Sequence, residues 1–173
     1  PGQGAEPLRA GEAFRFNSTM PASIEEFMGG NFSLNRNLAL RLGGFDENFV
    51  GAAYRFEAEF ADRYVKAFGP IRFHPEASIR HLAISTGGTR AHGHHLTTMK
   101  PGHSAGAYYY LLKTRRPGWL MQVFWRPIRA IRTRHHLRRP WWIPLTLLAE
   151  CRGALLALRL LRDGSKLMET KLG

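Results

Sequence analysis

The stretch Gly43-Gly44-Phe45-Asp46-Glu47 separates two segments that the sequence predicts to be helical. Before it, Asn35 can accept hydrogen bonds from the backbone of a first helical turn, and leucines recur from there to Leu42. A pair of glycines then ends this helix, because glycine adopts the left-handed conformation that is common after a helix C-terminus. After it, aromatic residues recur at three- and four-residue steps over 54–68, which predicts a second helix that Gly69-Pro70 ends.

Short strand-like segments and further helical segments accompany these two helices. Alternating side chains predict strands at 23–28, 71–74 and 77–82. Helical periodicity returns at 107–113, 120–132 and 141–161. Between these groups, residues 91–106 contain several glycines and histidines and few core-forming side chains, which predicts a mobile loop. We therefore expect an α/β fold followed by a helical extension.

Charge is divided unevenly between the two halves of the chain. Residues 1–86 carry 9 Lys or Arg against 10 Asp or Glu, whereas residues 87–173 carry 16 against 3. The formal net charge of +12 therefore comes from the second half, which predicts a polyanionic partner there: anionic lipid, a phosphorylated substrate or nucleic acid. The single Cys151 excludes an intramolecular disulfide framework and a zinc site built from several thiolates.

Four short motifs occur in order between residues 27 and 90. They are Gly29-Gly30-Asn31, Gly43-Gly44-Phe45-Asp46-Glu47, Glu57-Ala58-Glu59-Phe60 and Ile79-Arg80-His81-Leu82. In this order and spacing they resemble the acceptor-binding half of a family-two glycosyltransferase. The resemblance implies a partial GT-A domain, which is Rossmann-like, and a parent enzyme of the hexosyltransferase type. That enzyme would transfer a sugar from a nucleoside-diphosphate donor to a hydroxyl acceptor with inversion.

The nucleotide-binding half of such enzymes has no counterpart in these residues. No Asp-x-Asp occurs, and residues 1–13 contain neither an initiator methionine nor the apolar core of a secretory signal. The chain therefore reads as the later part of a longer polypeptide, and we expect it to have no transferase activity by itself.

Glu57 is the candidate catalytic base. An inverting transfer needs a carboxylate that takes the proton of the acceptor hydroxyl. The family places an Asp there, usually within a Glu-Asp pair, at the start of this helix. Here Phe56 stands at the usual Glu position and Glu57 at the Asp position, while Glu59 becomes a candidate for acceptor contact. The alternative is that Glu57 and Glu59 only favour the positive end of the helix dipole.

Four further residues are candidates for the acceptor site by the same resemblance. Gly29 and Gly30 would let a ligand approach the backbone closely, and Asn31 would hydrogen-bond a sugar. A Gly-Gly-Asn sequence is also common as a purely structural turn. Asp46 would contact the acceptor or, alternatively, accept backbone hydrogen bonds within its own turn.

His81 and Arg90 are the candidates for metal and diphosphate binding. The resemblance implies that His81 ligates a divalent ion, Mn²⁺ or Mg²⁺, together with carboxylates of the donor half and the diphosphate. Arg90 would neutralise the leaving diphosphate. The alternatives are a structural histidine and a solvated Gly-rich loop. The neighbouring histidines are too irregularly spaced to predict a metal site of their own: His92, His94, His95 and His103.

Aromatic and basic residues are interleaved in the last third of the chain, from Trp119 to Trp142. This combination suits a lipid headgroup region, where rings lie in the interface and cations meet phosphates. Leucines over 145–161 extend an amphipathic pattern, but Glu150, Arg152 and Arg159 argue against a spanning helix. The alternatives are a helical hairpin with a solvated basic face and nucleic-acid binding, which is disfavoured because no recognisable nucleic-acid module accompanies the charge.

These observations predict three regions: an acceptor-side GT-A portion over 1–90, the loop 91–106, and a basic amphipathic extension over 107–173. The expected partners are a nucleotide-sugar donor, a saccharide or lipid-linked acceptor, and an anionic membrane surface. The expected location is the cytoplasm, peripheral on the inner face of the membrane. The alternative function is a non-enzymatic membrane- or polyanion-binding module that keeps the fold without the chemistry.

Overall fold

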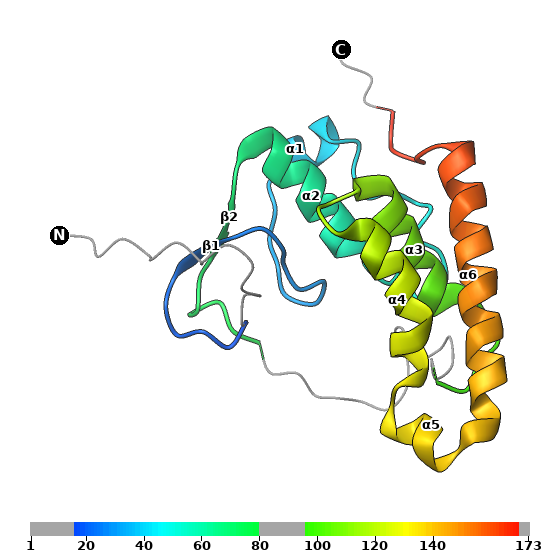
Figure 1. Cartoon of the computed structure of the whole chain (residues 1–173). Coiled ribbons are helices and arrows are strands. Elements are labelled where there is room, and N and C mark those ends of the chain that lie inside the picture. Colours follow the sequence, from blue (N-terminus) through cyan, green and yellow to red (C-terminus); the bar gives the residue numbers. More distant parts are fainter. Residues whose placement is uncertain (1–15, 80–95, 170–173) are drawn as a thin grey trace. The chain divides into compact units, whose positions relative to one another are not determined.

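The computed structural model describes residues 16–79 and 96–169, which form a mixed α/β structure that is mostly helical (Figure 1). In chain order the elements are β1 (Ala22–Ile24), α1 (Arg36–Arg41), α2 (Phe56–Phe68), β2 (Ile71–Phe73), α3 (Gly102–Thr114), α4 (Trp119–Ile131), α5 (Arg134–Arg138), the 3₁₀ turn η2 (Pro140–Trp142) and α6 (Ile143–Asp163). This content agrees with the expected α/β class. The described residues divide into two compact units, which we call the sheet unit (16–45, 57–79 and 168–169) and the helical unit (46–56 and 96–167).

The two units differ from the predicted division at residue 90. Residues 46–56, which come early in the chain, belong to the helical unit. The loop predicted over 91–106 also ends early, because α3 begins at Gly102. Ser104, Ala105 and Gly106 are buried in that helix. The small residues that suggested a loop are therefore packing residues.

Other predicted boundaries also change, and the helices and strand predicted at 107–113, 120–132, 141–161 and 71–74 are observed as α3, α4, α6 and β2 with shifted ends. The strand expected over 23–28 is the shorter β1, and residues 77–79 form no strand, while the rest of that segment lies outside the described residues. The second predicted helix begins two residues late, at Phe56. Just before it, Ala53 and Arg55 have φ values of 48° and 75°. Because these values are left-handed, the backbone cannot enter the helix earlier.

The sheet unit is built around aromatic side chains. β1 and β2 pair antiparallel, with Ser23 opposite Arg72. Rings from six residues form one cluster: Phe27, Phe32, Phe45, Phe60, Tyr64 and Phe68. Phe60 is 1% exposed, and its ring centroid lies 4.5 Å from that of Phe45. Packing of these rings around the buried Phe60 stabilises the unit and fixes which face of α2 points inward.

The Gly43-Gly44 turn connects α1 to the aromatic cluster. Asn35 caps α1, since its Oδ1 accepts from the backbone N–H groups of Asn37 and Leu38 at 2.9 and 3.3 Å. Gly43 and Gly44 have φ values of 77° and 67°. Glycine adopts these left-handed values without strain. The first predicted helix, its cap and its termination are thus confirmed.

The helical unit has α3 and α6 packed side by side at its centre, with α4 against both (Figure 1). The two central helices approach closely because their contact consists of small residues. A Cβ added to Gly153 of α6 would lie 2.1 Å from Ser104 Oγ, so only glycine fits there. Ser104 Oγ in turn donates to the carbonyl of Ala149 at 2.9 Å, which links the helices.

Candidate functional site

The candidate base Glu57 lies in the first turn of α2. The two left-handed residues before the helix, Ala53 and Arg55, each cost about 1–3 kcal/mol, and such strain is concentrated at functional sites. Glu57 is half-buried, and it makes no hydrogen bond or ion pair with the residues that the structure describes. Its carboxylate is therefore not committed to a structural contact.

Glu59, expected to contact the acceptor, is instead committed to Arg63. The Glu59 side chain is 1% exposed, and its two oxygens accept from Arg63 Nε at 2.7 Å and Nη2 at 2.9 Å. The same guanidinium donates to the carbonyls of Leu42 and Gly44 at 2.6 and 2.8 Å. A bidentate ion pair of this kind is strong and directional. The predicted acceptor contact of Glu59 is thus replaced by an internal pair that ties α2 to the end of α1.

Asp46 is a structural carboxylate of the helical unit. Its side chain is 0% exposed; Oδ2 accepts from the Tyr109 hydroxyl at 2.7 Å and from Lys113 Nζ at 2.5 Å. Oδ1 accepts from the backbone N–H groups of Asn48 and Lys166, both at 3.0 Å. Burial acts to raise the pKa of Asp46, but Lys113, the Asn48 amide and Tyr109 together hold it below its usual value. The turn role is observed, and these four donors leave no place for an acceptor sugar.

Gly29, Gly30 and Asn31 lie in an exposed turn of the sheet unit. A Cβ added to Gly30 would meet no atom within 4 Å, so the space around it is open. Asn31 donates from Nδ2 to the carbonyl of Ala77 at 2.7 Å. The turn is therefore fixed to the segment that follows β2, while its glycines stay accessible to a ligand.

His81 and Arg90 lie outside the described residues, as do three of the neighbouring histidines: His92, His94 and His95. Within 16–79 and 96–169, no group of three or more His, Cys, Asp or Glu side chains is arranged to hold a metal ion. The divalent metal and the diphosphate contact therefore stay predictions that rest on the motif resemblance.

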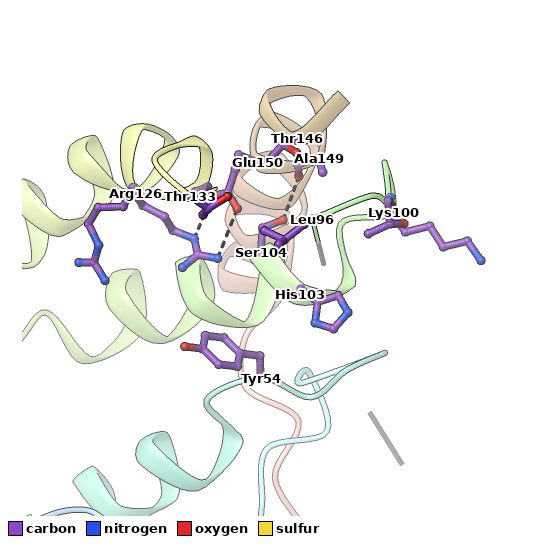
Figure 2. Close-up of a pocket in the computed structure, with 13 residues that line it drawn as sticks. Tyr54, Leu96, Lys100, His103, Ser104, Arg126, Thr133, Thr146, Ala149 and Glu150 are labelled. Carbon is purple, nitrogen blue, oxygen red and sulfur yellow. Dashed lines mark hydrogen bonds and ion pairs between the residues drawn. The ribbon is translucent and has the colours of Figure 1, made fainter. Parts of the chain in front are cut away.

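The helical unit contains a cavity of about 460 Å³ that the sequence did not indicate (Figure 2). Its walls come from α3, α4, α6 and the segments that precede α2, α3 and α5. Charged and hydroxyl-bearing side chains line much of it, among them Lys100, Arg126, Arg129, Thr133, Thr146 and Glu150. A cavity of this volume is in the range of sites that bind small organic ligands.

One wall of the cavity is an ion pair between α4 and α6. Arg126 Nε lies 3.0 Å from Glu150 Oε2, and Arg126 Nη2 donates to Glu150 Oε1 at 3.3 Å. Nε and Oε2 are buried, yet neither makes a well-directed hydrogen bond with the described residues, so charge rather than hydrogen-bond geometry joins them. Arg126 also lies over the ring of Tyr108, 5.3 Å from its centroid. Burial and the Glu150 carboxylate raise the pKa of Tyr108, which keeps its hydroxyl protonated.

A second wall is organised by a buried histidine. His136 is 1% exposed, and its Nδ1 and Nε2 lie 2.8 Å from the hydroxyls of Thr133 and Thr146. Both threonines line the cavity. Burial, with the neighbouring His135, lowers the pKa of His136, so the imidazole is neutral near pH 7. One ring nitrogen therefore donates and the other accepts.

The helix α4 has its apolar side toward solvent. We call this side the α4 apolar face; it consists of Leu120, Met121, Phe124, Trp125 and Ile128. Phe124 is 73% exposed, and no residue of α4 is buried. The opposite side, which lines the cavity, carries Arg126 and Arg129. This is the reverse of an ordinary amphipathic helix, and an exposed apolar patch of this kind marks a docking surface.

The segment that follows α4 also exposes apolar side chains. Leu137 and Trp141 are 82% and 64% exposed. They stand among exposed arginines: Arg132, Arg134, Arg138 and Arg139. Aromatic and aliphatic side chains mixed with cations are typical of surfaces that meet a lipid headgroup layer.

Comparisons of the chain with protein-family models, with curated proteins and with solved structures found no match. In the described part of the chain, no helix combines the length and the apolar character that crossing a membrane requires. Function is therefore inferred from the motifs and from local geometry.

Proposed function

We propose that this chain is the acceptor-side part of a family-two inverting glycosyltransferase with a GT-A fold, acting on the cytoplasmic side of a membrane. The observation that carries the proposal is Glu57. By the motif resemblance, Glu57 stands where the family has its base; it lies in the first turn of α2 and has no structural partner among the described residues. A general base needs such an uncommitted carboxylate to take the proton of the attacking hydroxyl.

Two further features support this assignment. The Gly43-Gly44 turn is held by Arg63 at the Leu42 and Gly44 carbonyls, which gives the motif a fixed shape. The Gly29-Gly30 turn leaves open space where an acceptor could approach. In the complete enzyme we expect a donor half to supply the nucleotide site and the Asp-x-Asp. His81 would then complete a Mn²⁺ or Mg²⁺ site, and Arg90 would neutralise the diphosphate.

Glu57→Gln tests the base in the complete enzyme. The amide cannot accept the proton, so kcat for sugar transfer is expected to fall by about 10²–10⁴-fold while donor binding changes little. Transfer of a labelled sugar at saturating donor measures kcat, and titration of the donor measures its affinity.

Two further variants serve as controls for this test. Glu76→Gln removes an exposed carboxylate of the same unit and should leave turnover unchanged. Glu57→Asp restores the carboxylate of the family at a shorter reach and should retain part of the rate. Near-normal turnover in Glu57→Gln would remove Glu57 from the base role. Robust turnover by the isolated chain would show that no donor half is needed.

A second candidate function, docking on an anionic membrane surface, is favoured by the α4 apolar face. Its five side chains lie on one side of the helix and are 41% to 73% exposed. Water contact with so much apolar surface is unfavourable, and a bilayer interface would remove it. The arginines that follow α4 would meet lipid phosphates and add attraction that depends on salt.

Phe124→Ser with Trp125→Ser tests this docking. Because each ring contributes about 1.5–3 kcal/mol when fully buried, the partition of the chain onto anionic vesicles should fall by tenfold or more. Vesicle flotation at moderate salt measures the partition. Val50→Ser, a 48% exposed position of the same unit, is the control and should have no effect. Equal flotation of the double variant, or binding to nucleic acid alone, would contradict membrane docking.

A further inference from the structure

The side chains that line the cavity of the helical unit favour the binding of a negatively charged ligand. Among the described residues that line it, Lys100, Arg126 and Arg129 carry positive charge and only Glu150 carries a carboxylate. Arg126 offsets Glu150, because Nε and Oε2 lie 3.0 Å apart. Lys100 and Arg129 then give the cavity an excess of positive charge, and neither makes an ion pair with the described residues. A cavity with this balance selects anions.

The side chain of Arg129 is well suited to bind a phosphate group in this cavity. The Arg129 guanidinium offers several N–H donors in a planar fork, which matches two oxygens of a phosphate. Arg126 stays paired with Glu150, because its buried Nε lies 3.0 Å from Oε2, so Arg129 is the arginine left for a ligand. Lys100 stands at the rim, where its side chain extends away from the other labelled residues (Figure 2). Its flexible stem allows the ammonium to turn toward a bound anion.

The cavity wall that contains His136 supplies a hydroxyl donor. Thr133 Oγ1 caps α5 by accepting from the backbone N–H of His136 at 3.3 Å, and it lies 2.8 Å from His136 Nδ1. In the tautomer that carries the ring proton on Nε2, the Thr133 hydroxyl donates to Nδ1 and Nε2 donates to Thr146 Oγ1 at 2.8 Å; the proposal takes this tautomer. Thr146 Oγ1 accepts this hydrogen bond from the imidazole. The hydroxyl hydrogen of Thr146 can then be donated to an acceptor in the cavity.

We propose that this cavity binds a phosphate group, held by Arg129, Lys100 and the hydroxyl of Thr146. This inference does not depend on sugar transfer. The phosphate belongs either to a soluble phosphate ester or to a phosphomonoester lipid headgroup, and both present the same oxygens to these donors.

Titration of the intact chain with inorganic pyrophosphate tests the site. Calorimetry at moderate salt should show saturable binding that weakens by about tenfold or more in Lys100→Gln with Arg129→Gln. The matched control is Arg132→Gln with Arg138→Gln, which removes the same charge from exposed positions that do not line the cavity. It should leave the affinity almost unchanged. Equal losses in the two double variants, or no binding by the unmodified chain, would overturn the proposal.

The His136 ring gives a readout from inside the cavity. Because His136 is 1% exposed and its Nε2 contacts Thr146, a phosphate at Thr146 should shift the imidazole resonances, whereas an anion on surface arginines should not. An unchanged His136 spectrum at saturating pyrophosphate would also overturn the proposal. Circular dichroism of each variant confirms that it is folded.

Vesicles distinguish the two sources of the phosphate. Phosphatidic acid presents a phosphomonoester, whereas phosphatidylserine at equal surface charge presents a shielded diester. A preference for phosphatidic acid that disappears in Lys100→Gln with Arg129→Gln identifies a lipid headgroup. Saturable pyrophosphate binding without such a preference identifies a soluble ester. Either result supports the site, and neither depends on Glu57 or on transfer.

Discussion

Asp46→Ala is expected to lower the free energy of unfolding of the helical unit by about 3–5 kcal/mol. The change removes the carboxylate that lies 2.5 Å from the Lys113 ammonium and the acceptor of the Tyr109 hydroxyl. It also leaves two backbone N–H groups, those of Asn48 and Lys166, without their acceptor. Removing one partner of a buried pair is costly because the other partners stay desolvated.

Urea unfolding followed by circular dichroism measures this loss. Glu47→Gln is the matched control, because it neutralises the next residue of the same turn, whose side chain is exposed. The control should change the free energy of unfolding by less than about 0.5 kcal/mol. If Asp46→Ala cost no more than the control, the network around Asp46 would contribute nothing to stability.

The Asp46 carboxylate also makes the stability of the helical unit decrease at acidic pH. Its pKa in the folded state is lowered, so its contribution is fully present above the unfolded value of about 3.9. That contribution is lost as the pH falls through the lower folded pKa. We expect the thermal midpoint to decline below about pH 4 and the decline to be shallower in Asp46→Asn. Thermal scans between neutral pH and pH 2 compare the two proteins.

Gly106→Ala is the second substitution with a large expected effect. The added Cβ would lie 2.3 Å from the carbonyl oxygen of Tyr54 and 3.2 Å from its carbon, closer than such atoms approach. Both obstacles are backbone atoms, so no side-chain rotation relieves the overlap. We expect a loss of about 3 kcal/mol, the upper part of the range for overpacked cores, although alanine favours helix formation.

Gly102→Ala in the same helix is the control for Gly106→Ala. Its Cβ would meet its nearest neighbour, the backbone nitrogen of Ala52, at 3.7 Å, an ordinary contact. The unfolding midpoint of Gly102→Ala should therefore stay level or rise. Chemical denaturation of both variants decides the matter: equal midpoints would show that the close approach of Tyr54 to α3 is not required.

Local signals predicted the helix ends of the sheet unit better than its strands. Asn35 and the Gly43-Gly44 pair fixed the ends of α1, and Gly69-Pro70 fixed the end of α2, because caps and breakers act within a few residues. The start of α2 was placed too early, since no sequence signal marks the left-handed backbone of Ala53 and Arg55.

The helical unit was harder to predict because its determinants are not local. Gly102 and Gly106 lower helix propensity, yet they lie in α3, where close packing overrides propensity. For the site, the Glu59–Arg63 pair could have been found, because the two residues are spaced i,i+4. The cavity could not, since its lining comes from segments between Tyr54 and Glu150 that are joined only by tertiary packing.

The hydrogen bonds of Asp46 and Asn48 also set the order in which the chain can fold. Asn48 Nδ2 donates to the carbonyl of Gly164 at 2.6 Å, and Asp46 accepts from the amide of Lys166; these bonds span 116 and 120 residues. Closing so long a loop costs entropy before any contact forms. During synthesis, Asp46 leaves the ribosome long before Lys166 does. The helical unit therefore completes its structure late, and until then the carboxylate that it will bury stays in water.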